Sequence, residues 1–507
     1  GGGNITFAAD VSGDSLLTVT AGTGDVSFQS TIGGGTPLSG LVLTANSVDF
    51  TGAIAVDDQG LMVTASTTTN LEGSITATNG GSVQFSSAVA LTDTLQISTG
   101  AGAGNVQFGS TVDGAEQLTI TAGTGNVTFS GAVGAGTALS GLTIVSAGDV
   151  DFDGTVTVSG AVQQQAGTGT TTISGAMTAA SVSLTTADLD VLADITATGG
   201  DITLTGDGMT TLLAADLTTA GGNITINDSV LVSGSRTLDS GNGQTAATAG
   251  AIQITGPVGS VDAAGDTLTL DARGGTTDGT VTLLDDVGNP ADTIGGSAAL
   301  RLNGLTVFGS TATLAGVQLT GGDLAVTADA ITLAGSVYQT QTSGDILLTG
   351  PVTVSAASAS LSAAGNVSLS STLQGSAGTE DVSVTAGGTA TFTGAISMLN
   401  DLTVNADGTT TFSETVVLAG DLQTDTDGAS GTTVVTKDVT TSGQQVFADG
   451  VTLAGDITFT GVDTDADGEG VEFGSTLAGG NNTLTIMGGG AFVGAVTNVT
   501  TFGADSI

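Results

Sequence analysis

The sequence predicts an all-β chain folded as a parallel β-solenoid (β-helix) with turns of about 20–23 residues, which together form an elongated rod. Three observations support this: a short internal repeat, Gly or Ser at recurrent corners, and short stretches of Val, Ile, Leu and Thr with one apolar face. Such stretches are typical of β-strands. No window of about 11 or more residues combines helical periodicity with a helix cap.

Repetition is visible at two lengths. The block LTVTAGTGDVSF, from Leu17 to Phe28, recurs as LTITAGTGNVTF, from Leu118 to Phe129. Inside it lies a unit of five residues that starts with an apolar residue, has Gly or Ser in the middle and ends with an aliphatic residue. Between residues 28 and 173 its successive starts differ by 22, 35, 23, 21, 23 and 21 residues. A fixed short period with one longer step indicates stacked repeats.

The short unit predicts a strand followed by a corner. Side chains alternate along a strand, so the first, third and fifth residues of the unit point inward. A small inward residue between two large ones suits a bend of the backbone. Each solenoid turn buries its apolar row against the turns above and below. We therefore expect the recurrent Phe residues to stack into an internal ladder.

A string of bacterial immunoglobulin-like sandwiches is the alternative fold, because its strands also recur every 8–12 residues or so. That fold usually contains a buried Trp and a tyrosine corner. This chain has no Trp and one Tyr, Tyr338, so the solenoid is the preferred interpretation.

We divide the chain into regular solenoid repeats over 1–235, a less regular stretch with inserted loops over 236–296, and further repeats over 297–507. In the middle stretch SGNGQTAATAG and DARGGTTDGT break the period, and two of the four basic residues, Arg236 and Arg273, occur there. Long loops carry function more often than regular turns do. A binding patch, if the chain has one, is expected in this stretch.

Charge and missing residue types exclude several functions. The 507 residues contain 48 Asp and Glu against four Lys and Arg, and no His, Cys or Trp. Nucleic acids and anionic lipids need Lys and Arg, so neither is an expected partner. No apolar run is long enough for membrane insertion. Thiol and imidazole chemistry is absent. We expect no enzyme; a β-helix enzyme that cleaves polysaccharides with paired carboxylates is the remote alternative.

The best candidate for a metal site is GVDTDADGEG. Asp463, Asp465 and Asp467 stand at alternate positions and are followed by Gly468. Calcium loops place oxygen ligands at positions 1, 3 and 5 and Gly at position 6. Position 12 is Gly474 instead of Glu, and no helices flank the loop, so an EF-hand is excluded. Two interpretations stay open: a calcium-binding solenoid loop and a solvated acidic turn.

Two weaker acidic patterns are interpreted without a metal ion. Asp149, Asp151 and Asp153 alternate with apolar residues, so they are expected on the outer face of a strand. Asp425 and Asp427 form half of a calcium motif and no more.

Several phrases resemble the β-strand repeats of giant bacterial surface and secreted proteins, related in style to filamentous-haemagglutinin adhesins. They are AGTGNVTFSGAV (Ala122 to Val133), GGDITLTG (Gly199 to Gly206) and GGNITI (Gly221 to Ile226). The resemblance covers nearly the whole chain. It implies an extracellular or cell-surface structural rod or filament-forming segment, with a mechanical role in a fibre or coat. An adhesin that recognises a surface or a carbohydrate is the alternative.

The partner expected for such a rod is another solenoid turn. Solenoid ends expose unpaired strand edges, which are normally covered by a cap. No cap is evident at Gly1 or Ile507. We therefore expect either a longer chain or copies that associate end to end.

Overall fold

The computed structural model describes residues 2–262, 265–289, 293–294, 297–298, 300–428, 431–464 and 468–504. Within these residues the regular structure consists of β-strands. No helix occurs there, and so none that is long and apolar enough to cross a membrane. The strands form a parallel β-solenoid, as the sequence predicts. The chain divides into two compact units: unit 1 holds residues 1–231 and 237–250, and unit 2 holds residues 232–236 and 251–507.

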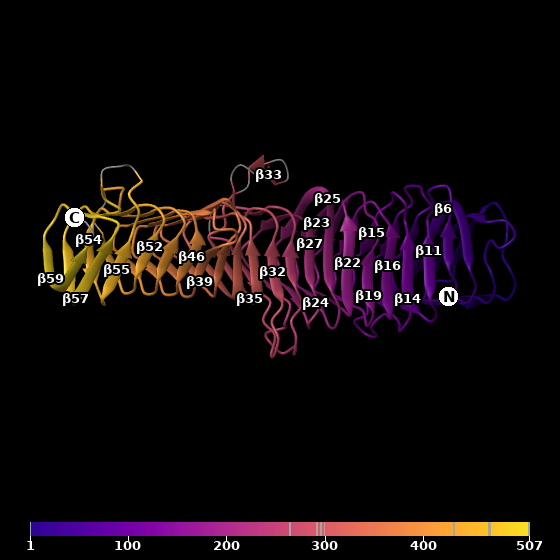
Figure 1. The fold of residues 1–507 in the computed structure, drawn as a ribbon. Coiled ribbons are helices and arrows are strands. Elements are labelled where there is room, and N and C mark those ends of the chain that lie inside the picture. The colour runs from indigo at the N-terminus through magenta and orange to yellow at the C-terminus, as the bar shows by residue number, and fades with distance from the viewer. Residues whose placement is uncertain are drawn as a thin grey trace. The chain divides into compact units, whose positions relative to one another are not determined.

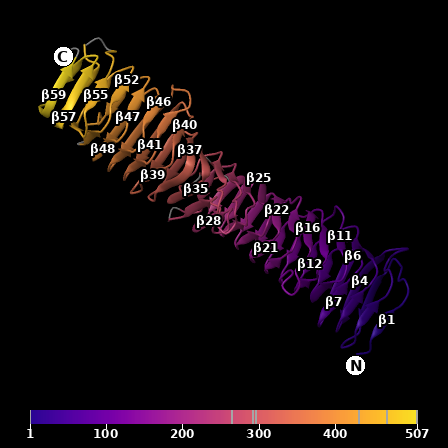
Figure 2. The same ribbon diagram turned by 60° about the horizontal axis from the view of Figure 1, so that its bottom comes forward.

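Each complete turn contributes three short strands, and equivalent strands of successive turns stack in parallel into three columns. Figures 1 and 2 show this stacking within unit 1, from β6 to β25, and within unit 2, from β37 to β59. Register gives the length of a turn. Val106 pairs with Val127 and Val127 pairs with Val150, which are steps of 21 and 23 residues. The predicted period is therefore confirmed.

In unit 1 the first column contains β2 (Leu16–Thr20), β4 (Leu38–Ala45), β6 (Ile54–Ala65), β9 (Val83–Phe85), β12 (Val106–Phe108), β15 (Val127–Phe129), β17 (Val150–Phe152), β20 (Thr170–Ile173), β23 (Asp188–Val191) and β25 (Ile202–Leu213). The second contains β1 (Ile5–Phe7), β3 (Val26–Phe28), β5 (Val48–Phe50), β7 (Thr68–Leu71), β10 (Ala88–Leu91), β13 (Val112–Asp113), β18 (Val156–Thr157), β21 (Met177–Ala179), β24 (Ile195–Ala197), β26 (Leu217–Thr219) and β28 (Ser235–Asp239). The third contains the start of β6, β8 (Ile75–Ala77), β11 (Leu95–Ser98), β14 (Gln117–Thr121), β16 (Gly141–Ser146), β19 (Ala161–Gln164), β22 (Ser181–Thr186), the start of β25 and β27 (Ile224–Val232).

In unit 2 the first column contains β30 (Val258–Ser260), β36 (Val317–Leu319), β38 (Val337–Thr340), β41 (Ser358–Ala363), β44 (Asp381–Ala386), β47 (Leu402–Ala406), β50 (Leu422–Thr424), β53 (Gln445–Phe447), β56 (Val471–Phe473) and β58 (Gly490–Phe492). The second contains β29 (Ile252–Ile254), β32 (Thr280–Leu283), β35 (Gly304–Leu314), β37 (Leu324–Leu333), β40 (Val352–Val354), β43 (Leu373–Gly375), β46 (Ile396–Leu399), β49 (Val416–Leu418), β52 (Val439–Thr441), β55 (Ile457–Thr460) and β57 (Leu477–Met487). The third contains β31 (Thr267–Asp271), the first halves of β35 and β37, β39 (Ile346–Thr349), β42 (Val367–Leu369), β45 (Ala390–Phe392), β48 (Thr409–Phe412), β51 (Thr432–Val435), β54 (Gly450–Leu453), the start of β57 and β59 (Val496–Ala504). A short antiparallel pair, β33 (Thr293–Ile294) and β34 (Ser297–Ala298), lies outside the columns.

Alternation along the strands places the apolar side chains inside. In β15, Val127 and Phe129 are fully buried, whereas Thr128 between them is half-buried. The same pattern holds for Val150, Asp151 and Phe152 in β17. A parallel strand that is buried on one side only therefore has a sequence in which apolar and polar residues alternate. The core of each unit is a continuous stack of these inward rows.

The Phe residues stack as predicted, but in separate ladders. Rings of Phe7, Phe28 and Phe50 are parallel neighbours in the second column of unit 1, with centroids 4.4 and 5.4 Å apart. The ladder from Phe85 to Phe152 lies in the first column. Phe50 lies in the second column and Phe85 in the first. The step of 35 residues between them therefore covers one full turn and about two thirds of the next. The prediction of a single ladder is thus corrected.

Consecutive turns touch at the corner, and at its Gly positions the neighbouring backbone leaves no room for a Cβ. A Cβ on Gly154 would lie 2.5 Å from the carbonyl carbon of Gly131 in the preceding turn, and one on Gly52 would lie 2.6 Å from that of Ser30. Real Cβ contacts are longer. At these positions Gly is therefore required by the backbone of the neighbouring turn.

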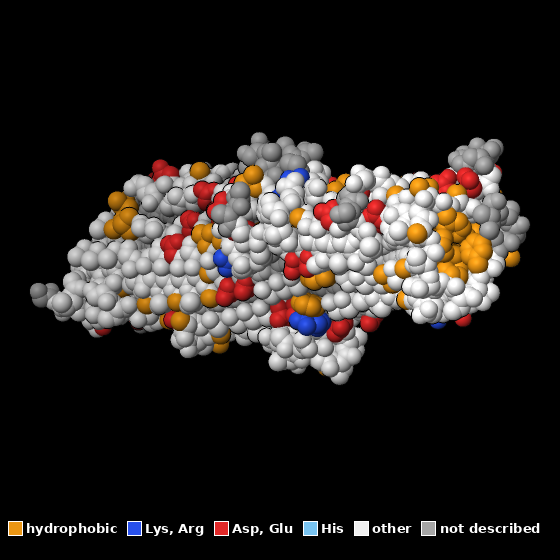
Figure 3. Space-filling view, turned by 90° about the vertical axis from the view of Figure 1, so that its left-hand side faces the viewer, with side chains coloured by type: hydrophobic (Ala, Val, Ile, Leu, Met, Phe, Trp, Pro, Cys, Tyr) orange, Lys and Arg blue, Asp and Glu red, His pale blue; other side chains and the backbone are white. Residues whose placement is uncertain are grey.

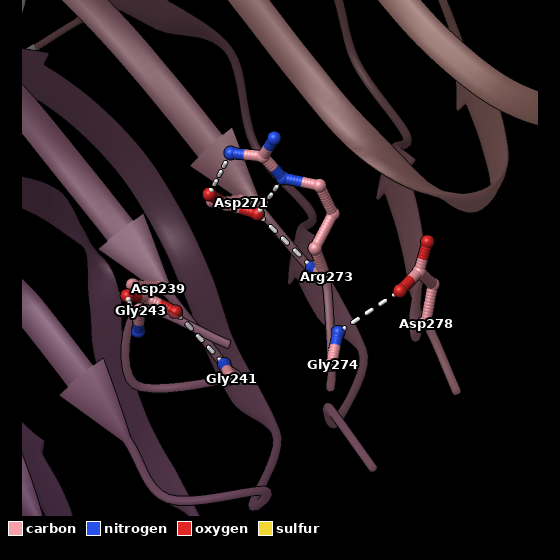
Figure 4. A network of polar contacts seen from close by, with 7 residues as sticks. All are labelled: Asp239, Gly241, Gly243, Asp271, Arg273, Gly274 and Asp278. Carbon is pink, nitrogen blue, oxygen red and sulfur yellow. Dashed lines mark hydrogen bonds and ion pairs between the residues drawn. The ribbon is translucent and has the colours of Figure 1, made fainter. Parts of the chain in front are cut away.

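Longer steps occur where the sequence loses its period. In unit 2, Ile252 pairs with Val281 and Leu268 pairs with Leu305, which are steps of 29 and 37 residues. The additional residues form loops outside the columns, among them Ala272 to Gly279. In unit 1 the loop that follows β28 is closed by Asp239, whose carboxylate accepts from the backbone N–H groups of Gly241 and Gly243 at 2.8 and 2.6 Å (Figure 4).

Candidate functional site

Many of the acidic side chains act as hydrogen-bond acceptors between turns. The residue just before an inward strand is repeatedly Asp or Asn, and its Oδ1 accepts the backbone N–H of the equivalent residue one turn later. Asn126 accepts from Asp149 at 2.9 Å, and Asp149 accepts from Thr170 at 3.0 Å. Asp323 accepts from Asp345 at 2.9 Å, and Asp345 accepts from Asn366 at 2.6 Å. We call this arrangement the Asx ladder.

The Asx ladder was not predicted, although the sequence contains a signal for it. The repeated blocks GTGDVSF and GTGNVTF place Asp25 and Asn126 at the same position. Asp and Asn share an acceptor oxygen but differ in charge. Because either Asp or Asn occurs at this repeat position, the position requires the acceptor oxygen and not the charge. At Asp25, hydrogen bonds from Asn46 and then Ser47 also hold the pKa of the carboxyl below its ordinary value.

The predicted calcium loop is described only in part. Asp463 is half-buried between β55 and β56, and its Oδ2 accepts the backbone N–H of Gly468 at 3.0 Å. Asp465 and Asp467 lie outside the described residues. Within the described ranges no group of three or more acidic side chains is arranged to hold a metal ion. Calcium at this loop therefore stays a prediction.

The weaker acidic patterns have structural surroundings. Asp151 faces outward between the buried Val150 and Phe152, as predicted, and burial, followed by the charge of Asp153, raises the pKa of its carboxyl. Asp425 is turned into the protein and is 2% exposed. It accepts from the backbone N–H of Ala406 at 3.1 Å, and burial raises its pKa.

The surface feature best suited to binding lies in unit 2, around the loop Ala272–Gly279. Gly279 N–H donates to the carbonyl oxygen of Ala272 at 2.7 Å and closes the base of the loop. Asp278 accepts from the backbone N–H of Gly274 at 2.9 Å (Figure 4). The loop is therefore held in one shape by its own hydrogen bonds.

Arg273 begins this loop and is fixed by two neighbours. Its Nε and Nη2 donate to the two carboxylate oxygens of Asp271 at 2.8 and 2.6 Å (Figure 4), a fork arrangement that fixes the plane of the guanidinium. The same guanidinium lies 3.8 Å from the centroid of the Phe308 ring. Contact of this kind between Arg and an aromatic face is attractive.

Phe308 differs from the Phe residues of the ladders because it faces outward. Leu305 and Val307 in β35 are buried, so Phe308, the next residue, belongs to the outer row. Register places Asp271 beside Phe308, Phe308 beside Thr327 and Thr327 beside Thr349 on successive turns. Phe308 was not predicted as a site residue, although Val307 and Phe308 are adjacent in the strand, so one of the two must face outward.

Two adjoining hollows surround the loop. One is lined by Gly274 to Asp278, Ser310 and Asp329. The other is lined by Arg273, Asp278, Gly309, Thr327 to Asp329 and Thr349 to Pro351. Both include Asp278 and Asp329, so together they form one polar surface, which we call the Arg273 hollow. It combines carboxylates, hydroxyls and a guanidinium, and lies partly within the stretch 236–296 where a binding patch was expected.

Comparison of the chain with protein-family models, with curated proteins and with solved structures finds no match.

Proposed function

We propose that the chain is an extracellular structural segment of a giant bacterial surface protein and that its role is mechanical, in a surface fibre or coat. The observation that supports this most directly is the way each turn is attached to the next. Backbone hydrogen bonds of three strand columns and the side-chain bonds of the Asx ladder act together at many turns. A load along the stack would be shared by many bonds.

The resemblance to filamentous-haemagglutinin-like repeats is consistent with this role, because those repeats occur in surface and secreted rods. The four Lys and Arg residues also leave few sites for trypsin-like proteases. Arg273, one of the four, is held by Asp271 and Phe308. Cleavage concentrates in exposed, poorly ordered segments. A chain of this composition suits prolonged exposure outside a cell.

The proposal is tested on the source bacterium and on the purified chain. Antibodies against the chain are expected to label unpermeabilised cells. Electron microscopy of the purified chain is expected to show continuous rods or fibres with an axial repeat near 4.8 Å, the spacing of adjacent strands. Labelling only after lysis would contradict the surface location, and beads on a string would contradict the mechanical role. Loss of fibres in a chelator would assign the loop at Asp463 to assembly.

An adhesin is the second candidate, and the Arg273 hollow is the observation that favours it. A mechanical stalk does not need an ordered loop that fixes an Arg over an outward Phe. Deletion of the loop residues 274–278 is expected to reduce attachment to a target surface while the rods seen by microscopy stay unchanged. Unchanged attachment would remove this candidate.

A further inference from the structure

We propose that the Arg273 hollow binds an uncharged oligosaccharide. This inference rests on the adhesin candidate for the same hollow and names the chemical class of its ligand, which a rod or coat does not require. Arg273, Phe308 and the loop Ala272–Gly279 form an ordered surface, and two adjoining hollows that share Asp278 and Asp329 lie beside it.

The polar groups of the hollow match the hydroxyl groups of a sugar. The carboxylates of Asp278 and Asp329 can accept from sugar hydroxyls, and the hydroxyls of Thr327 and Thr349 can both donate and accept. The guanidinium of Arg273 has donors only. A polyol presents donors and acceptors close together, so it can satisfy both kinds of group at once.

Preorganisation strengthens this match. Arg273 is 36% exposed at its side chain, yet its plane is fixed by Asp271 and Phe308 before any ligand arrives. Binding then costs little conformational entropy at this side chain. The loop is also closed by Gly279 and Asp278, so its backbone need not order on binding.

Charge argues for an uncharged ligand. The charge of Arg273 is compensated by Asp271, and Asp278 and Asp329 add two further carboxylates. The chain as a whole carries a net charge of −44. An anionic polymer would be repelled by this field. Within the described residues no group of three or more acidic side chains is arranged to hold a metal ion, which argues against calcium in the hollow. Figure 3 shows acidic side chains spread over one face, with few basic ones.

The test uses the full chain and isothermal titration with four uncharged hexasaccharides: cellohexaose, maltohexaose, mannohexaose and chitohexaose. We expect at least one of them to bind. Asp329→Ala is expected to weaken that binding by about tenfold or more, which corresponds to the loss of one well-made hydrogen bond to a charged group. Asp329 is exposed, so this variant should fold normally.

A matched control separates an effect of the hollow from the general effect of removing one negative charge. Asp407→Ala removes the same charge from an exposed position in unit 2, outside the residues that line the hollow, and should leave binding unchanged. Arg273→Lys keeps the charge but loses the fork to Asp271, and should also weaken binding. Binding that Asp407→Ala weakens as much as Asp329→Ala would overturn the proposal.

Three further results would overturn it. The first is that none of the four hexasaccharides binds. The second is that hexalysine or Ca²⁺ binds in their place with dependence on Asp329, which would make the hollow a cation site. The third is that a polygalacturonate hexamer binds more tightly than every uncharged sugar. None of these results bears on rod formation, which microscopy of the Asp329→Ala variant follows separately.

Discussion

At the scale of single residues, the side-chain oxygen of the Asp or Asn just before a strand helps to hold the fold together. In the Asx ladder it accepts a backbone N–H one turn away, so a negative charge is tolerated there and not required. This explains a composition in which Asp is frequent while Lys and Arg are almost absent. The acids of the Asx ladder supply acceptor oxygens, so they do not need a base to pair with.

Asp345 tests the Asx ladder. Its Oδ1 accepts from the backbone N–H of Asn366 at 2.6 Å and from the side-chain amide of Asn366 at 3.2 Å. Asp345→Ala leaves that N–H without its acceptor and should lower the free energy of unfolding by about 1–3 kcal/mol. Urea unfolding followed by circular dichroism measures the change.

Asp345→Asn is the matched variant, because it keeps Oδ1 and removes only the charge. We expect its free energy of unfolding to lie within about 0.5 kcal/mol of the parent chain. Equal destabilisation by Ala and Asn would mean that the charge matters and the acceptor does not.

Glu380 provides a pH-dependent case. Its side chain is 3% exposed and accepts from Ser376 Oγ at 2.7 Å and from the backbone N–H groups of Ala377, Gly378 and Thr379. The hydrogen bond from Ser376, with those from the backbone, lowers its pKa from 4.5 to about 2. A lowered pKa stabilises the fold at every pH above the unfolded value. The contribution is then lost as the pH falls toward about 2.

Glu380→Gln should therefore destabilise the chain at neutral pH, and the difference from the parent should shrink as the pH falls from 4.5 toward about 2. Urea midpoints across that range measure it. Glu414→Gln, at an exposed side chain in the same unit, also removes one negative charge and is the control for a general effect of charge. A difference that does not depend on pH would rule out ionisation of Glu380 as its source.

At the scale of elements, the corner is the most constrained part of a turn. Gly131, Gly154 and Gly175 stack on one another in successive turns, so a side chain at any of them meets backbone that cannot move alone. Gly154→Ala should lower the free energy of unfolding by about 1–3 kcal/mol, the usual cost of overpacking. Thermal or urea unfolding measures the loss.

Gly199→Ala is the control for the corner. A Cβ at Gly199 has no neighbour within 4 Å, and its backbone conformation is an ordinary one. This substitution should leave stability unchanged or raise it slightly through the unfolded chain. If both Ala variants cost the same, the contact between turns would not explain the corner.

The elements themselves could be predicted because their cause is local. Alternation in segments such as VTF at Val127 fixes which side chains are buried, and the period fixes how turns stack. The jump of the Phe ladder between columns could not be predicted, because the residues that pair across turns depend on the full length of each turn. Phe50 pairs with Leu71, whereas Phe85 pairs with Val63.

The Arg273 hollow was predictable only as a region. Loss of the period and the presence of Arg273 marked the stretch 236–296. Phe308 and Asp329 lie outside that stretch and meet the loop only because longer turns place β35 and β37 beside it. Contacts between distant segments of this kind depend on register, which the sequence pattern of one turn does not contain.

At the scale of the whole molecule, like charges are the main cost of this composition. The net charge is −44, and the Asx ladder places carboxylates on adjacent turns, for example Asp194 before Asp216 and Asp401 before Asp421. Adjacent strands are about 4.8 Å apart. At low ionic strength the Debye length is about 30 Å, and at physiological ionic strength it is about 8 Å. Repulsion between turns should therefore be strong in dilute buffer and much weaker in salt.

We accordingly expect the urea midpoint to rise when NaCl is increased from about 0.01 M to about 0.15 M, because screening favours the compact state. KCl should have the same effect as NaCl, since the mechanism is screening. CaCl₂ at matched ionic strength separates the two interpretations of the loop at Asp463. A larger rise in CaCl₂, abolished by Asp463→Asn, would establish a calcium site there, and an equal rise would assign the loop to the solvated acidic surface. A midpoint that falls or stays constant in NaCl would show that repulsion between turns does not limit the stability of this fold.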